Sequence, residues 1–461
     1  MKNPFATFGT ALVVALAVAI FFWPPPAGYT SQTMHAGALC LLAIGLWAFN
    51  TLPEHLVGLL FFLIAMVFAI APANIVFSGF ASGTLWLVLG GLIIAEAVNR
   101  TGLGLRFARV LVGSHTLSYR SLIAAVVLVS SLMCVVMPAT VSRILLLLPI
   151  MAALAQRLGL PPGSSGHDGV ALAVIVTNYQ VGTSFLPANA PNLVLAGAAE
   201  TLYKTTFIYG EWLLVQLPVM GVLKALVITG LIWFLCPDRT QSVPAEDNPK
   251  PMSAEEKRLT VILLTALLLW VTDFIHRIHP GWVGLAAGLA ALMPGTRVMP
   301  VNSLVEQVKL GPFFYIAAIL GLGSLMVETG LSRALGDALQ GGLRLESGHD
   351  ALNFAILTLL ATVTGAIVTN VAQPALLAPL ASHFAEAAGW PLRAVLMTIV
   401  LGFTTAIFPF QAPPLLVGVQ LAGLSLRRVL RVTVPLAIVS LFVLLPINYF
   451  WWRAIGYFGP R

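Results

Sequence analysis

Charged residues are scarce in this chain. Only 9% of its 461 residues are Asp, Glu, Lys or Arg, whereas 59% are hydrophobic. A soluble domain carries about 25% charged residues, so the composition excludes an ordinary soluble protein. Apolar segments long enough to cross a bilayer recur to the end of the chain, and one long polar stretch, 237–258, interrupts them. We therefore expect an all-α integral membrane protein in contact with a lipid bilayer.

Signatures of enzymes and metal sites are absent as well. The sequence has no HExxH, GxSxG or P-loop pattern, and its three cysteines lie far apart without metal or redox spacing. Ser165, His167 and Asp168 come close together within 161–169. Adjacent residues of a Gly-rich turn rarely face one another, so we interpret this segment as a solvated loop. We expect the protein not to be an enzyme.

Basic residues outnumber acidic ones and give a net charge of +7. They lie in short loops between apolar segments, which is the pattern that orients a protein in a membrane and not one that binds nucleic acid. We predict a protein of a bacterial inner membrane with its N-terminus in the cytoplasm and a retained first span. In that orientation the loops that hold most Lys and Arg fall inside: 99–120, 237–258, 295–311 and 425–431.

Two stretches interrupt an apolar sequence with polar residues and proline. In 362–380 the apolar sequence meets Asn370 and resumes after Pro374. Proline has no N–H and clashes with the preceding turn, so the helix is expected to break here. The stretch 137–149 repeats the pattern around Thr140. Matched breaks in two halves of a chain indicate the binding site of a transporter.

Other short sequence matches relate the first half of the chain to the second. They occur in the same order, with a common shift of roughly 222–230 residues, which indicates an internal repeat. An odd number of spans separates corresponding elements, and this inverts the second copy in the membrane. The predicted divisions are a first span with its lead-in at 1–35, a first repeat at 36–236 with a re-entrant hairpin at 121–156, a cytoplasmic linker at 237–258, a second repeat at 259–424 with a re-entrant hairpin at 350–388, and a last span at 425–461.

Each hairpin tip is expected to face the interrupted helix of its own half, which breaks at 186–192 or at 408–414. Hydroxyl, amide and backbone N–H groups would line this meeting point without a carboxylate. Such a lining suits an anion, and helix N-termini strengthen the preference. The alternative is that small and polar residues only let the hairpins pack closely. The side chains within reach of a ligand are Thr140, Ser142, Asn189, Thr369, Asn370, Gln373 and Gln411.

The paired motifs resemble those of the divalent anion/sodium symporter family, within the wider ion transporter superfamily. Thr369-Asn370-Val371 looks like the second tip motif, and Ala139-Thr140-Val141 stands where the first belongs. The resemblance implies about eleven spans, two re-entrant hairpins, a homodimer and elevator-like movement of a transport domain. Taken with the residues above, it predicts these substrate-binding positions: Ala139, Thr140, Val141, Ser142, Arg143, Asn189, Ala190, Pro191, Thr369, Asn370, Val371, Gln373, Gln411, Ala412 and Pro413.

The chain departs from the family pattern at its tips. Sodium is implied near Thr140 and Asn370, but only Asn370 keeps the tip asparagine, and Arg143 stands where the family has a small residue. An arginine at mid-membrane costs at least about 2.5–3.5 kcal/mol, so the position should be paired or functional. Two interpretations stay open. Either Arg143 turns away to satisfy carbonyl groups at the break, or it permanently supplies the positive charge that sodium supplies elsewhere in the family.

The predicted function is secondary active transport of small anions, similar to di- or tricarboxylates, with no cofactor beyond sodium as a candidate coupling ion. Three alternatives are kept: a sodium-independent anion exchanger, a sulfate or sulfonate carrier, and an anion channel. A channel should line a continuous path with polar rings, whereas the polar residues here gather at the paired breaks.

Overall fold

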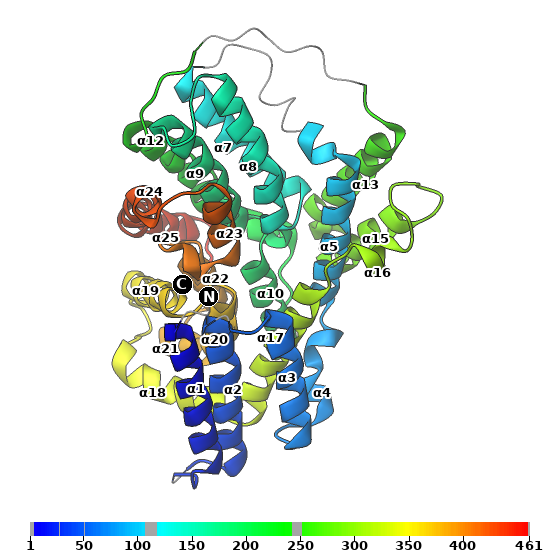
Figure 1. Cartoon of the computed structure of the whole chain (residues 1–461). Helices are drawn as coiled ribbons and strands as arrows, with labels where there is room; N and C mark the ends of the chain where they lie inside the picture. Colours follow the sequence, from blue (N-terminus) through cyan, green and yellow to red (C-terminus); the bar gives the residue numbers. More distant parts are fainter. Residues whose placement is uncertain (1–3, 27, 50, 107–117, 242–250, 460–461) are drawn as a thin grey trace.

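The computed structural model describes residues 4–26, 28–49, 51–106, 118–241 and 251–459. Within these ranges the chain is helical and has no β-strand, which confirms the predicted all-α class (Figure 1). Among the described residues, seven helices are long and apolar enough to cross a membrane: Ser31–Phe49, Gly83–Thr101, Thr140–Arg157, Tyr209–Leu235, Gly311–Glu328, Asp350–Ile367 and Leu426–Ala454.

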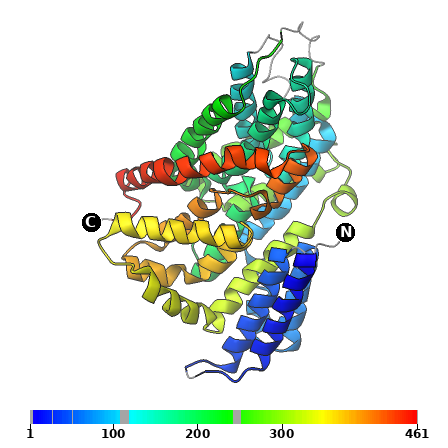
Figure 2. The ribbon, with the colours of Figure 1, turned by 60° about the vertical axis from the view of Figure 1, so that its left-hand side comes forward.

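Three N-terminal helices lie side by side at one end of the molecule (Figure 2). They are α1 (Pro4–Phe22), α2 (Ser31–Phe49) and α3 (Glu54–Val67). Large apolar side chains such as Leu12 and Leu63 are exposed on them. Exposed apolar side chains on helices that satisfy their own backbone groups are suited to contact with lipid.

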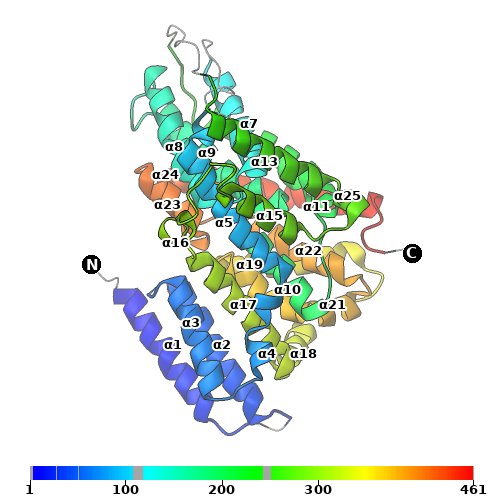
Figure 3. The same cartoon turned by 90° about the vertical axis from the view of Figure 1, so that its right-hand side faces the viewer.

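The helices α5 (Gly83–Thr101) and α15 (Pro280–Leu292) run alongside each other (Figure 3). A Cβ added to Gly90 would lie 2.3 Å from the carbonyl oxygen of Gly284, so only glycine permits this approach. The long helix α17 (Gly311–Glu328) contacts both α5 and α3. The other described helices of this region are α4 (Ala73–Val76), η1 (Ser78–Ala81), α13 (Ala254–Val271), α14 (Asp273–His276), α16 (Ser303–Glu306) and α18 (Leu331–Leu343).

The remaining helices form two series with the same order of elements. Each series has a helical hairpin, then a broken helix, then a helix interrupted by a π-helical turn. The first series is α7 (Tyr119–Val136), α8 (Thr140–Arg157), α9 (Ser165–Gln180), η2 (Gly182–Ser184), η3 (Leu186–Ala188), α10 (Ala190–Tyr203), α11 (Tyr209–Gln216), η4 (Leu217–Leu223) and α12 (Lys224–Leu235). The second is α19 (Asp350–Ile367), α20 (Ala372–Leu377), η5 (Ala378–Leu380), α21 (Ala381–Ala388), α22 (Leu392–Phe403), η6 (Pro409–Gln411), α23 (Pro413–Leu421), α24 (Leu426–Val439), η7 (Ser440–Leu444) and α25 (Leu445–Ala454).

The structure corrects the interpretation of 161–169 as a solvated loop. The side chain of Ser164 accepts a hydrogen bond from the backbone N–H of His167, and this cap starts α9 at Ser165. His167 and Asp168 are therefore buried in the first turn of a helix. Asp168 forms an ion pair with Arg428, at 2.7 Å, and so joins α9 to α24.

The predicted limits of the linker and of the two breaks are also corrected. Ser253 and Glu256 form a capping box that starts α13 at Ala254, so the last residues of 237–258 are helical. Positions 242–250 of that linker, and 107–117 of the basic loop, lie outside the described residues. The helices before the breaks end at Gln180 and Phe403, several residues before the predicted starts at 186 and 408.

Candidate functional site

The tip of the first hairpin contacts the break that follows it. Thr140 is the first residue of α8, and its hydroxyl donates to the carbonyl oxygen of Ala188 at 2.9 Å and lies 3.3 Å from Oδ1 of Asn189. Ala139 at the N-cap provides no side-chain cap. The first N–H groups of α8 therefore lack an acceptor from the capping side chain, and they leave the partial positive charge of a helix N-terminus at this tip.

Arg143 is completely buried beside that tip. Its Nε–H donates to Oδ1 of Asn178 at 3.1 Å. Its two terminal nitrogens donate to backbone carbonyl oxygens of Met137, Asn178 and Ala188, at 3.0–3.1 Å for the last two residues. One of them also donates to the hydroxyl of Thr140 at 3.1 Å. All three guanidinium nitrogens are thus engaged by oxygens of the tip and the break.

The oxygens around Arg143 are of the kind that bind a hard cation. Backbone carbonyls can replace the hydration shell of an alkali ion, but here the guanidinium already takes these acceptors. The carbonyl of Asn178 also belongs to the C-terminal turn of α9, where a positive charge is favourable. While Arg143 is in place, these carbonyl oxygens are therefore engaged by its guanidinium and do not provide a sodium site at the first tip.

The second tip is joined to its own break in a similar way. The backbone N–H of Asn370 donates to the carbonyl oxygen of Gln411 at 2.7 Å, and Nε2 of Gln411 donates to the carbonyl oxygen of Gly365 at 2.8 Å. Nδ2 of Asn370 donates to the hydroxyl of Tyr179 at 2.8 Å and contacts the carbonyl oxygen of Phe403 at 3.3 Å. Asn370 therefore links the second hairpin to both broken helices.

Two amide oxygens at the second tip have no described hydrogen-bond partner. Oδ1 of Asn370 and Oε1 of Gln373 are both buried and unpartnered. They point toward Gly365, since a Cβ added there would lie 2.8 Å from the first and 3.0 Å from the second. Two side-chain oxygens are a fraction of the six or more ligands that hard cations usually take. They provide part of a cation shell, and they equally suit a bound water.

The two breaks also contact each other. Nε2 of Gln180 donates to the carbonyl oxygen of Ala406 at 2.9 Å, and the hydroxyls of Thr183 and Thr404 are hydrogen-bonded. The buried ammonium of Lys224 donates to the carbonyl oxygen of Thr404 at 2.6 Å. Residues of both halves therefore share one polar junction in the interior of the protein.

Sequence reasoning missed several members of this junction. Lys224 left a clear signal, because it is the only charged residue in the apolar run 212–236, and ionisable residues within such runs are functional candidates. Gln180 and Thr404 left none, because they fall before the predicted starts of the breaks.

The structure places the predicted site residues in two groups, one at each tip. The side chain of Asn370, predicted to lie within reach of a ligand, is fully buried at the second tip. Ser142 is half-buried and takes no part in the described contacts between tip and break. The other predicted positions belong to the two tips and breaks: Ala139, Thr140, Val141, Arg143, Asn189, Ala190 and Pro191 at the first, and Thr369, Val371, Gln373, Gln411, Ala412 and Pro413 at the second.

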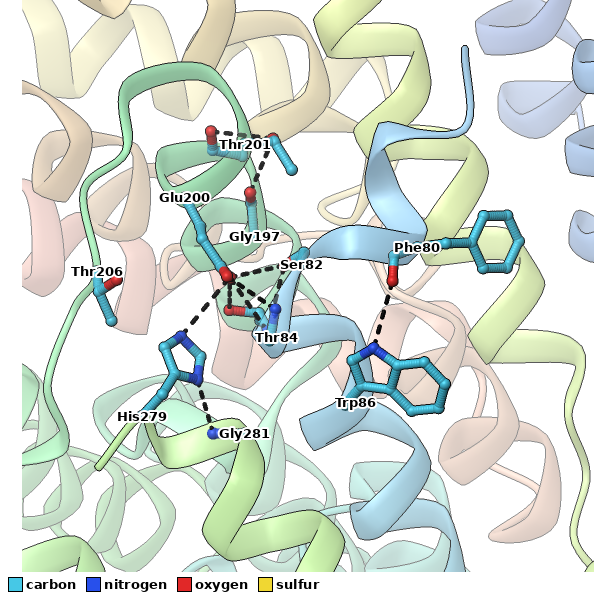
Figure 4. Close-up of polar contacts among 12 residues, drawn as sticks. Phe80, Ser82, Thr84, Trp86, Gly197, Glu200, Thr201, Thr206, His279 and Gly281 are labelled. Carbon is cyan, nitrogen blue, oxygen red and sulfur yellow. Dashed lines mark hydrogen bonds and ion pairs between the residues drawn. The ribbon is translucent and has the colours of Figure 1, made fainter. Parts of the chain in front are cut away.

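A partly buried carboxylate anchors the helix after the first break. Glu200 of α10 accepts hydrogen bonds from Ser82 Oγ at 2.7 Å, Gly83 N at 2.7 Å, and Thr84 N and Oγ1 at 3.1 and 3.0 Å (Figure 4). A carboxylate is favourable at the N-terminus of a helix, here α5. Nε2 of His279, the N-cap residue of α15, lies 3.6 Å from the same carboxylate. Burial lowers the pKa of His279, and Glu200 offsets part of that shift.

Replacing Glu200 with alanine is expected to loosen the attachment of α10 to α5. The change removes four acceptor contacts, and a hydrogen bond to a charged group contributes about 1.5–3 kcal/mol. We expect a lower melting temperature in detergent. Glu200→Gln is the matched control, because it keeps one carbonyl oxygen and should fall between the two. A melting temperature unchanged in Glu200→Ala would contradict this role.

Comparison with known proteins identifies what the chain is similar to. Residues 6–458 match the family model described as the sodium:sulfate symporter transmembrane region. A "membrane protein" of Cupriavidus necator is 24% identical over 97% of this chain and 91% of its own length. An "L-tartrate/succinate antiporter" of Escherichia coli is 28% identical. That match covers 58% of this chain and 57% of the antiporter.

Two solved structures share the fold. The YdaH transporter of Alcanivorax borkumensis aligns with a TM-score of 0.58 and 16% identity, over 93% of this chain and 100% of that one. MtrF of Neisseria gonorrhoeae, described as illuminating a class of antimetabolite efflux pumps, aligns with a TM-score of 0.55 and 16% identity. It covers 97% of this chain and 94% of its own. At this level of identity the likeness concerns the fold alone.

Proposed function

Because the chain belongs to the sodium:sulfate symporter family, whose members are transporters and not enzymes, we propose that it is a secondary active carrier that exchanges small anions without sodium. One observation carries the proposal. Arg143 donates to the carbonyl oxygens of Met137, Asn178 and Ala188, the acceptors that a cation at the first tip would need. A guanidinium is always charged in proteins, so the positive charge at this tip is permanent.

The substrate proposed is a dicarboxylate or a similar divalent anion. It would bind at the N-terminus of α8, where Ala139 provides no cap and where the charge of Arg143 lies one turn away. The guanidinium nitrogens are engaged by the protein, so Arg143 would attract an anion through its charge. Similarity to the L-tartrate/succinate antiporter favours four-carbon dicarboxylates. Sulfate or a sulfonate is the second candidate, favoured by the family's description.

We infer an elevator-type movement in which the two hairpins and their broken helices travel together. The contacts of Asn370 with Tyr179, and of Thr183 with Thr404, join both series of elements into one unit. The helices α1–α5 and α13–α17 would form the fixed scaffold, with about eleven spans and two re-entrant hairpins in total. The same proposal includes a homodimer in a bacterial inner membrane and a cytoplasmic N-terminus.

The inverted arrangement of the two hairpins predicts opposite sidedness of their outer ends. Cysteines introduced at Ser164 and Ser347, in a variant without Cys40, Cys134 and Cys236, should react from the cytoplasm and from outside, respectively. Impermeant thiol reagents applied to intact cells and to inverted vesicles measure this. Labelling of both positions from the same side would rule out the inverted repeat and the domain limits that depend on it.

The proposed function is tested by binding and by counterflow. Purified protein is heated with tartrate, succinate, citrate, sulfate or a sulfonate, each with and without sodium, because a ligand that binds the folded state raises the melting temperature. Proteoliposomes loaded with the stabilising anion should then take up the labelled anion in a saturable manner. Unsaturable flux that does not respond to internal anion would instead indicate a channel.

A further inference from the structure

Lys224 is a second buried cation at the junction of the breaks. It is completely buried at the point where the π-helical turn η4 gives way to α12. Its ammonium donates to the carbonyl oxygen of Thr404, directly after the last residue of α22. Within the described part of the chain no carboxylate pairs with it. π-Helical turns occur frequently at functional sites, and intramembrane lysines are functional candidates by default.

The contacts of Lys224 parallel those of Arg143 at the other break. Arg143 donates to the carbonyl of Asn178 near the end of α9, and Lys224 donates to a carbonyl at the end of α22. Thr404 connects the two, because its hydroxyl bonds with that of Thr183 and contacts the carbonyl oxygen of Gln180 at 3.2 Å. Each broken helix therefore presents its negative end to a positively charged side chain of the protein.

A side chain that only satisfies a buried carbonyl oxygen at a tip or break need not be charged. Gln373 occupies the position of the second tip that corresponds to Arg143, and its neutral amide satisfies the carbonyl oxygen of Ala361 at 2.8 Å. A buried cation without a carboxylate partner is costly. The charge of Lys224 at this position therefore points to a role in transport.

We propose that Lys224 is a specificity-determining residue that, together with Arg143, matches the two negative charges of the transported anion. The inference rests on the proposed function, because it assumes that Arg143 takes the place of a coupling cation. With a divalent anion bound, the moving unit would carry no net charge from these three groups. Without an anion it would carry two uncompensated positive charges. Moving charge through the membrane interior is costly, so the empty carrier should return slowly and exchange should be obligatory.

The test compares exchange with unaccompanied efflux in proteoliposomes of wild type, Lys224→Met and Lys224→Arg. Vesicles loaded with labelled sulfate are diluted into buffer with or without external sulfate. Wild type should exchange about 100-fold faster than it releases anion alone, the factor expected for moving uncompensated charge. Lys224→Met should reduce that ratio at least about tenfold. It should also accept methanesulfonate, a monovalent anion, relatively better than wild type. Lys224→Arg keeps the charge and should resemble wild type.

Each outcome decides the matter. Lys224→Met leaves the carbonyl oxygen of Thr404 without this donor, so its melting temperature is measured beside that of wild type, and Lys224→Gln, which keeps a donor for Thr404, serves if the methionine variant is unstable. All ratios are measured with and without sodium. A wild-type ratio and a wild-type preference for sulfate in both variants would overturn the role of Lys224 and leave the proposed function standing. Wild-type exchange that requires sodium would refute the proposed function separately, while the ratios in sodium still decide the role of Lys224.

Discussion

Arg143→Ala should abolish anion exchange in the absence of sodium. The change removes the charge at the first tip and takes the guanidinium donor from the carbonyl oxygens of Met137 and Asn178, while the carbonyl of Ala188 keeps the hydroxyl of Thr140. Each buried acceptor left unpaired costs about 1–3 kcal/mol, so stability should fall as well. A loss of about 3 kcal/mol at the transition state for movement corresponds to a rate reduction of about 100-fold. Initial rates of counterflow per folded carrier measure this effect.

The Arg143→Ala variant also tests why the arginine is there. The space left by the guanidinium would be lined by carbonyl oxygens and the hydroxyl of Thr140, which are ligands for an alkali ion. We therefore expect sodium to restore part of the exchange in Arg143→Ala and to have no effect on wild type. Arg143→Lys keeps the charge with fewer donors, so it should retain more activity than alanine in sodium-free buffer. Wild-type anion binding and exchange in Arg143→Ala would show that Arg143 only satisfies backbone carbonyls.

Asn370→Ala is expected to stop transport and to lower stability. The side chain joins the second tip to Tyr179 of α9 at 2.8 Å and to the carbonyl of Phe403 at 3.3 Å. Without it, the second hairpin loses its contacts with Tyr179 and with the carbonyl of Phe403, and two buried polar groups lose a partner. We expect destabilisation of about 1–3 kcal/mol and transport at least about 100-fold slower than wild type. Thermal unfolding and counterflow on the same preparation measure the two effects.

Asn353→Ala is the matched control for that variant. Asn353 is equally buried and belongs to the same hairpin, but it hydrogen-bonds the backbone of Glu346 at the far end of α19. Its replacement should lower the melting temperature and leave transport per folded carrier near the wild-type value. If both variants lose transport in proportion to their loss of stability, Asn370 has no specific role at the site.

The paired tips were predictable from the sequence because they depend on local chemistry. Proline ends hydrogen bonding within a helix, and polar residues around Asn370 and Thr140 in otherwise apolar segments mark the places where backbone groups need new partners. The contacts of Thr140 with Ala188 and of Asn370 with Gln411 agree with the expectation that each tip faces the break of its own half.

The remaining features depend on contacts between distant segments. Nothing local indicates that α9 ends at Gln180, because the carbonyls released there are satisfied by Arg143 and Thr404, from other parts of the chain. The Gly-rich segment before α9 suggested solvent, yet Asp168 is buried because Arg428 of a distant helix pairs with it. The π-helical turns left no recognised pattern, and the hydrogen-bond partner of Lys224, Thr404, lies 180 residues away in the sequence.

The most direct test of the central claim is counterflow of a divalent anion by wild-type protein in sodium-free medium. Proteoliposomes are loaded with unlabelled anion and diluted into labelled anion, with choline or sodium as the only external and internal cation. Because Arg143 already provides the charge at the first tip, the account predicts equal initial rates in choline and in sodium. Exchange that is absent in choline and rises with sodium concentration would contradict it.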